Sequence, residues 1–155
     1  MILDNIIEKR KIQLEKEKSK ITFENIKEQA SNKTEPTKGF YNALKTNSIA
    51  VISEVKKASP SKSVIREDFN PVEVAIEYEK AGANSISCLT EEFYFQGSSD
   101  YLKEIRKSVH IPILRKDFII DEYQIYEARV IGADAILLIA AILDVDTTKH
   151  FKNIA

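Results

Sequence analysis

Two short apolar runs of this chain each end in a lysine, and these lysines are its first candidates for chemistry. One run is Ile49–Lys56, with Glu54 two residues before its lysine, and the other is Ile111–Lys116. Each run is typical of a buried β-strand, in which residues two apart share a face, so Glu54 and Lys56 point the same way. Lysine is costly to bury unless it is paired or used, and α/β enzymes keep catalytic groups at the carboxyl ends of parallel strands. The two runs therefore predict one carboxylate and two ammonium groups around a shared site.

The composition excludes several classes of protein. The chain has 155 residues, of which 43% are hydrophobic and 30% charged, as in an ordinary globular domain. Its 23 Lys and Arg residues balance 24 Asp and Glu residues, so nothing favours nucleic acid or an anionic membrane surface as a partner. The N-terminus is too charged for a signal peptide, and no apolar run approaches the ~20 residues of a membrane span. We therefore expect a cytoplasmic protein with no membrane or nucleic-acid partner.

The first 46 residues predict a helical extension. The apolar residues expected on one face of its first helix are Ile2, Leu3, Ile6, Ile7 and Leu14. The stretch Lys9–Lys20 is rich in Lys and Glu, and we expect it to be a solvated helix face. Further helices are expected over residues 23–30 and 40–45, with a polar, turn-forming connector between them.

From residue 49 onward, predicted strands alternate with predicted helices. Strands are expected over residues 49–56, 85–89, 111–116 and 133–139, and helices over residues 70–81, 99–107, 121–130 and from about 146 or 147. Asn70, followed by Pro71, and Asp121 are the expected N-caps. The segments Ala81–Asn84 and Ile131–Asp134 hold the same place in successive units and mark an internal βα repeat. Such a repeat predicts a parallel sheet with right-handed crossovers.

Four βα units fit either an open sheet or half of a (β/α)8 barrel. No Gly-x-Gly-x-x-Gly follows any strand, which argues against dinucleotide binding. Polar groups recur at successive strand ends, and a barrel gathers those ends on one face. We therefore predict an α/β fold of the TIM-barrel family, truncated to about four βα units over residues 47–155, with residues 1–46 as the helical extension. Half a barrel has two open edge strands, which favours pairing with another chain.

Several longer motifs are specific when taken together. They are Ser53–Lys62, Tyr78–Ala83, Phe95–Ser98, Leu114–Asp121, Tyr123–Arg129 and Gly132–Ile139. Through these motifs the chain resembles the indole-3-glycerol-phosphate synthase family. The resemblance implies a barrel with an N-terminal helical extension and a decarboxylating lyase of tryptophan biosynthesis that uses neither cofactor nor metal. The implied substrate is 1-(2-carboxyphenylamino)-1-deoxyribulose 5-phosphate, which closes to indole-3-glycerol phosphate with loss of CO2 and water.

The resemblance also implies roles for individual residues. Lys116 matches the general acid that protonates the ketone oxygen as the aromatic carbon attacks. Lys56 matches the cation that pairs with the substrate carboxylate, and Glu54 matches the glutamate that holds both lysines and assists proton movement. The implied substrate-binding residues are Ser59 and Pro60 in the loop after the first strand, and Phe95, Phe118 and Leu137 around the aromatic ring.

The chain departs from the family pattern in two respects. Ser63 stands where the family usually has glycine, which implies a less mobile loop. The family's second catalytic carboxylate, its substrate-binding asparagine and the phosphate-binding loops after the seventh and eighth strands come later than Ala155. We therefore expect little or no activity from these 155 residues alone, and either a missing C-terminal half or self-association.

Other interpretations of these residues stay open. Glu54, Lys56 and Lys116 could form a structural ion-pair cluster at the barrel rim. The chain could also be a non-catalytic half-barrel that self-associates, or a weak phosphosugar-binding module. We expect Asp117 to support or cap rather than catalyse. Glu91, with its neighbour Glu92, is expected to be a solvated loop charge.

The remaining candidate residues do not indicate a further functional site. No group of His, Cys and Asp has the spacing of a metal site. His110 and His150 are expected at the surface. The lone cysteine, Cys88, lies in an apolar run and is expected to be a buried, reduced thiol.

Overall fold

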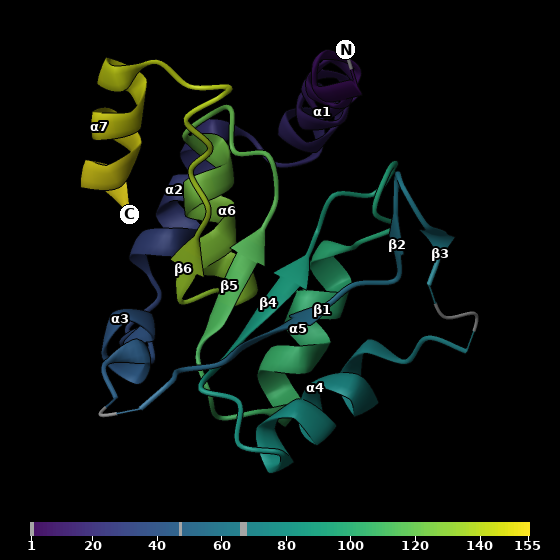
Figure 1. Ribbon diagram of the computed structural model, residues 1–155. Helices are drawn as coiled ribbons and strands as arrows, with labels where there is room; N and C mark the ends of the chain where they lie inside the picture. The colour runs from purple at the N-terminus through teal and green to yellow at the C-terminus, as the bar shows by residue number, and fades with distance from the viewer. Residues whose placement is uncertain (1, 47, 66–67) are drawn as a thin grey trace.

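The computed structural model describes residues 2–46, 48–65 and 68–155. It consists of a parallel sheet that helices cover on one face, and a long N-terminal helix crosses the carboxyl ends of the strands (Figure 1). The helices are α1 (Ile2–Lys20), α2 (Phe23–Ser31), α3 (Phe40–Leu44), α4 (Pro71–Lys80), α5 (Ser99–Ser108), α6 (Tyr123–Ile131) and α7 (Val145–Ile154). The strands are β1 (Ile52–Val55), β2 (Ala58–Ser59), β3 (Ser63–Val64), β4 (Ser85–Leu89), β5 (Ile113–Lys116) and β6 (Ala135–Ile136).

The main sheet has the strand order of a barrel wall. Its strands are all parallel and follow the order β1-β4-β5-β6, so each strand pairs with the next one along the chain. A doubly wound sheet would reverse its order at a switch point. Residues of α4, α5 and α6 pack in one core against a single face of the sheet. This one-sided, monotonic arrangement is the predicted barrel-type fold.

Alternation along the strands separates the core from the opposite face of the sheet. The strand residues that pack in the core under the helices include Val55, Ile86, Cys88 and Ile113. Residues of the other parity face away from these helices. The register pairs Glu54 with Ser87, and Lys116 with Leu89. Glu54 and Lys116 therefore lie on the same face of the sheet, away from the helical core.

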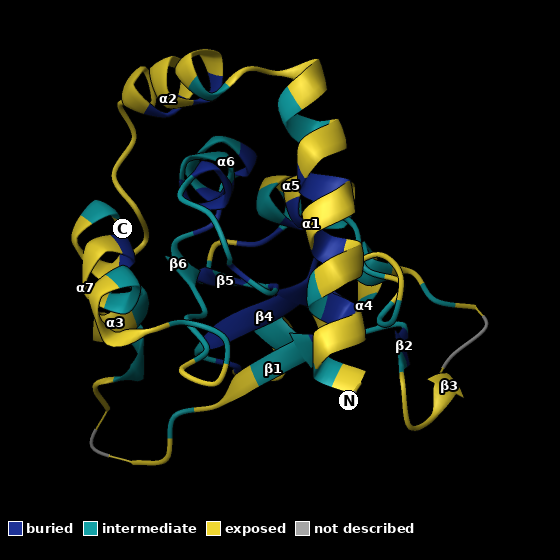
Figure 2. Ribbon diagram, turned by 90° about the horizontal axis from the view of Figure 1, so that it is seen from above, coloured by how far each residue is buried: buried dark blue, intermediate teal, exposed yellow. Residues whose placement is uncertain are grey.

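The two edge strands are shorter than predicted. β1 covers residues 52–55 rather than 49–56, and β6 covers 135–136 rather than 133–139. The prediction that the first run is buried is also wrong at its start, since Ile49 is 89% exposed and Ile52 is 47% exposed. The reason is that β1 pairs with β4 alone, so one side of it lacks a covering strand. The central strand β4 has the predicted bounds and is buried throughout, a contrast visible in Figure 2.

Helix ends follow their local capping signals. Asn70 caps α4 through its side chain, as predicted. Gly132 ends α6 with a left-handed φ of 94°, a conformation that strains other residues. The predicted N-cap Asp121 lies one residue before the observed cap, Glu122, yet its carboxylate still accepts the N–H of Tyr123 at 2.8 Å. The last helix, α7, begins slightly earlier than predicted, at residue 145.

The packing of α1 differs from the sequence prediction. Its buried residues are Ile6, Arg10, Gln13 and Leu14. Ile2, predicted on the apolar face, is 55% exposed. The prediction of a solvated face over residues 9–20 is wrong at Arg10, which has no exposed surface. The reason is that α1 lies across the polar carboxyl ends of the strands rather than on an apolar surface (Figures 1 and 2), so its buried face must carry polar groups.

The N-terminal helices α1 and α2 also pack against α6. Leu14 of α1 and Ile26 of α2 form a buried cluster with Tyr123 of α6. The rings of Phe23 and Tyr126 add an edge contact, with centroids 5.7 Å apart. Within the described part of the chain, no helix has both the length and the apolar character that crossing a membrane requires.

Candidate functional site

The three charged groups predicted at the strand ends lie together. Glu54 accepts a hydrogen bond from each lysine, with Oε1 2.8 Å from Nζ of Lys56 and Oε2 2.9 Å from Nζ of Lys116. Glu54 and Lys116 come from strands on either side of β4, which places their backbones two strand spacings, about 9.6 Å, apart. Their long side chains span this gap above β4. The predicted gathering of one carboxylate and two ammonium groups is confirmed.

The cluster is partly open to solvent and carries an excess of positive charge. The three side chains are 29% (Glu54), 31% (Lys56) and 36% (Lys116) exposed. Burial works to raise the pKa of Glu54, but the hydrogen bonds from the two lysines outweigh it, so the pKa is lowered from 4.5. Glu54 is therefore ionised at neutral pH. Each ammonium has three N–H donors, so both lysines keep donors for a further acceptor. One carboxylate between two ammonium groups suits an anionic ligand.

A hairpin that the sequence analysis placed in a loop forms one wall of the site. β2 and β3 pair antiparallel, with Ser59 opposite Ser63. Ser63 has a φ of 50°, in the left-handed region that favours glycine, which is a physical reason for glycine to be common there in the family it resembles. The sequence signal for this hairpin was the turn-forming Pro60-Ser61, although the residues on either side of it are largely polar.

A hollow of about 720 Å3 lies between this hairpin and the start of α1. Four of the predicted site residues line it, namely Lys56, Ser59, Pro60 and Phe95. Ile2 and Ile6 of α1 form its apolar side, and Lys62 adds a second positive charge. The hollow thus combines apolar surface with two ammonium groups, as a ligand with an aromatic part and an anionic part requires.

A second, smaller hollow of about 60 Å3 adjoins Lys116. It is lined by Phe95, Phe118 and Leu137, the three predicted apolar walls, together with Lys116. The two phenylalanine rings have centroids 6.2 Å apart. A cavity that holds benzene has roughly 150 Å3, so an aromatic ring fits here only when these side chains move apart. Phe95 lines both hollows.

Glu91 holds the loop that presents Phe95, and its predicted solvation is wrong. It is fully buried, and its carboxylate accepts the N–H groups of Phe93, Tyr94 and Phe95 at 3.0, 2.8 and 3.0 Å. A carboxylate at a strand end can satisfy a tight turn of otherwise unpaired N–H groups in this way. Its neighbour Glu92 is exposed, as predicted. Spacing alone does not distinguish these adjacent glutamates, so the burial of Glu91 was not predicted.

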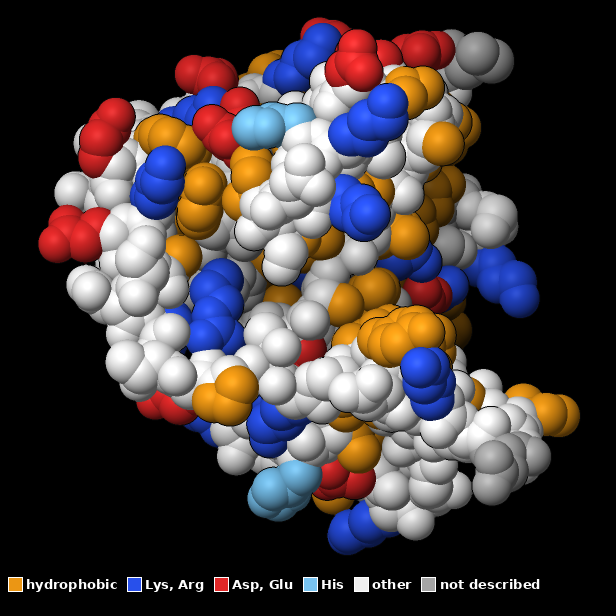
Figure 3. Space-filling view, turned by 90° about the vertical axis from the view of Figure 1, so that its left-hand side faces the viewer, with side chains coloured by type: hydrophobic (Ala, Val, Ile, Leu, Met, Phe, Trp, Pro, Cys, Tyr) orange, Lys and Arg blue, Asp and Glu red, His pale blue; other side chains and the backbone are white. Residues whose placement is uncertain are grey.

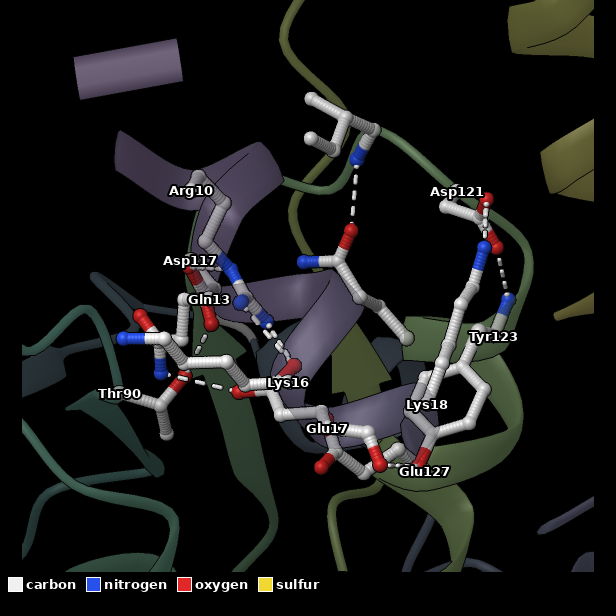
Figure 4. Close-up of polar contacts among 12 residues, drawn as sticks. Arg10, Gln13, Lys16, Glu17, Lys18, Thr90, Asp117, Asp121, Tyr123 and Glu127 are labelled. Carbon is white, nitrogen blue, oxygen red and sulfur yellow. Dashed lines mark hydrogen bonds and ion pairs between the residues drawn. The ribbon is translucent and has the colours of Figure 1, made fainter. Parts of the chain in front are cut away.

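A buried ionic network lies beside Lys116 and was also missed. Arg115 donates to the Thr90 hydroxyl at 3.2 Å and pairs with Asp117 at 3.2 Å and with Glu127 at 2.7 Å. Asp117 also accepts a hydrogen bond from the Thr90 hydroxyl at 2.7 Å. Figure 4 shows Thr90, Asp117 and Glu127 near the buried side of α1. These contacts are of the kind expected of a supporting residue at Asp117, whose role stays a prediction. No sequence pattern separated Arg115 from an ordinary strand residue.

The other titratable candidates lie outside the site. His110 and His150 have largely exposed side chains, as predicted. Cys88 is buried, as predicted, and burial raises its pKa to about 12, which keeps it a thiol. Over the described residues, no group of three or more His, Cys, Asp and Glu side chains is placed to hold a metal ion. On the face shown in Figure 3, Lys and Arg side chains are scattered among Asp and Glu rather than gathered.

Comparisons with known proteins agree on one family. The family model described as "Indole-3-glycerol phosphate synthase" matches residues 3–155. Curated proteins of that name are 51% identical in Acetivibrio thermocellus and 53% identical in Endomicrobium trichonymphae, each over 100% of this chain and 60% of the relative. The protein of that name in Campylobacter fetus is 53% identical over 93% of this chain and 56% of the relative. The chain thus spans about 60% of the length of the curated relatives it matches.

Proposed function

Because the chain belongs to the indole-3-glycerol phosphate synthase family, we propose that its site serves the ring closure and decarboxylation of 1-(2-carboxyphenylamino)-1-deoxyribulose 5-phosphate. The observation that carries this proposal is the bridge from Glu54 to both Lys56 and Lys116, beside hollows with apolar walls. A structural ion-pair cluster would need neither donors to spare nor a neighbouring cavity. The products would be indole-3-glycerol phosphate, CO2 and water.

In this proposal the two lysines act on different groups of the substrate, its carboxylate and its ketone. Lys56, which lines the larger hollow, pairs with the substrate carboxylate and orients it until CO2 leaves. Lys116, beside the apolar hollow, protonates the ketone oxygen as the aromatic carbon attacks the carbonyl carbon. Glu54 keeps both ammonium groups in place and assists proton movement. Positioned ion pairs of this kind lower the barrier mainly through orientation and charge stabilisation.

The substrate-binding surface follows from the same geometry. Ser59 and Pro60 are proposed to contact the substrate from the hairpin wall. Phe95, Phe118 and Leu137 are proposed to enclose the anthranilate ring after the two phenylalanine rings separate. We also propose a division into a helical extension, residues 1–46, and a barrel part, residues 47–155, and a cytoplasmic location.

The activity of the 155 residues alone stays a prediction, and we expect little or none. A direct test compares this chain with a fusion in which residues 1–155 are joined to the segment of the Acetivibrio thermocellus relative that lies beyond the matched region. Product formation is followed by the appearance of indole absorbance and fluorescence. The full-length relative is the positive control, and circular dichroism checks that the fusion is folded. A folded fusion with no turnover would refute the proposed function, and rapid turnover by the 155 residues alone would refute the expected inactivity.

A second proposal, self-association, rests on the exposed edge of the sheet. Ile49, Val51 and Ile52 precede or begin the edge strand β1, and all three are exposed. An exposed apolar edge favours pairing with another chain. Sedimentation velocity over a range of concentrations tests this, since a monomer at every concentration would exclude it.

A further inference from the structure

Arg10 of α1 is charged yet has no exposed surface, and it lines neither of the two hollows. A buried guanidinium is costly unless it is paired, so its partners identify what α1 is fixed to. Both terminal nitrogens of Arg10 donate to Oε2 of Glu17 on the same helix, each at 3.0 Å. Its Nε lies 3.4 Å from Oδ1 of Asp117 (Figure 4). Arg10 thus connects α1 to the residue that directly follows Lys116.

The residues on both sides of Lys116 belong to the buried network. Arg115 precedes it and Asp117 follows it, and both side chains are 1% exposed. Arg115 points away from the hollow that Lys116 faces, because successive side chains of a strand alternate. Asp117 follows the end of β5 and lines that hollow beside Lys116. The carbonyl group of Lys116 also accepts the N–H of Thr90 at 3.1 Å. The backbone that carries the Lys116 ammonium is therefore held on both sides by a buried network, which Arg10 joins through Asp117.

The same helix face reaches the larger hollow. Ile6 lines that hollow and is four residues before Arg10, so the two side chains lie on one face of α1, a turn apart. A shift of α1 would move the wall of the hollow and the anchor on Asp117 together.

We propose that Arg10 is a positioning residue that fixes α1 to Asp117. In this way it keeps the side of the larger hollow formed by α1 in a constant position relative to the Lys116 ammonium. The inference rests on the proposed function in one respect, namely that Lys116 acts on the substrate. Arg10 itself touches no reacting atom. A purely structural Arg10 would add stability without affecting where the Lys116 ammonium lies.

The test uses the 155-residue chain with lysines labelled with 13C at Cε, so it needs no turnover. The Lys116 signal is assigned by its loss in Lys116→Arg, and Glu54→Gln gives its position when the Glu54 ion pair is lost. In Arg10→Met we expect the Lys116 signal to move toward that position, and the Thr90 amide, directly after β4, to exchange roughly tenfold faster relative to the amide of Cys88 within β4. Lys11→Met is the matched control, since Lys11 is exposed on the same helix.

An unmoved Lys116 signal and unchanged relative exchange at Thr90, in a folded Arg10→Met chain, would overturn the proposal. Arg10→Gln, which keeps a hydrogen-bond donor for Glu17, supplies the same two readouts if the methionine variant does not fold. A shifted Lys116 signal together with an inactive but folded fusion would refute the proposed function and leave the coupling intact. An active fusion together with an unmoved Lys116 signal would support the proposed function and refute the coupling through Arg10.

Discussion

Replacing Glu54 by Gln removes the central carboxylate of the site with almost no change in shape. Glu54 makes two ion pairs, with Lys56 and Lys116, and all three side chains are roughly a third exposed. Ion pairs at this exposure contribute about 0.5 kcal/mol each, because solvent screens them. The substitution should therefore lower the free energy of unfolding by about 1 kcal/mol at neutral pH.

The pH dependence of this loss has a definite sign. The pKa of Glu54 is lowered from 4.5 in the folded chain, so Glu54 contributes stability above that ordinary value and loses the contribution as the pH falls through the lowered pKa. The difference in stability between the parent and Glu54→Gln should be largest at neutral pH. It should shrink toward zero in acid, where the parent carboxyl group is protonated in both states.

Urea unfolding followed by circular dichroism, at a series of pH values, measures this difference. Glu92→Gln is the control, because Glu92 is exposed and lies on the loop after β4. The account of Glu54 would be wrong if its substitution were stabilising at neutral pH, or if the loss stayed constant down to the acid limb.

Two further substitutions test the surroundings of the site. Arg115→Met removes the buried guanidinium that pairs with both Asp117 and Glu127 and should cost about 3–5 kcal/mol in urea unfolding; a loss under about 1 kcal/mol would show that the network does not hold this strand end. Gly97→Ala should destabilise the chain by at least about 2 kcal/mol, since its Cβ would lie 2.4 Å from the carbonyl oxygen of Leu89, and an unchanged thermal midpoint would contradict the tight loop seen here.

Local signals in the sequence were enough for much of the fold. Asn70-Pro71 predicted the start of α4, and the apolar run of residues 85–89 predicted β4 with its observed bounds. The edge strands β1 and β6 were predicted too long, because hydrophobic runs do not reveal how many neighbours a strand has. The hairpin of β2 and β3 was missed because each of its strands has only two residues.

The residues in and around the site were likewise predicted only in part. Glu54, Lys56 and Lys116 were predicted because strand alternation and barrel topology together determine where their side chains meet. Arg10 and Glu91 were not predicted, because their burial depends on α1 and on the loop after β4 folding back over the strand ends. A charged residue in a charged stretch carries no local sign of such burial.

The role of Lys116 is tested most directly by measuring turnover in the fusion with the Acetivibrio thermocellus segment after Lys116→Met, beside Lys107→Met as an exposed control. Loss of a general acid should lower kcat by about 10²–10⁴-fold, while the control keeps the parent rate and both variants stay folded. A Lys116→Met fusion that turns over within about tenfold of its parent would contradict the assignment, since general acids contribute more than that.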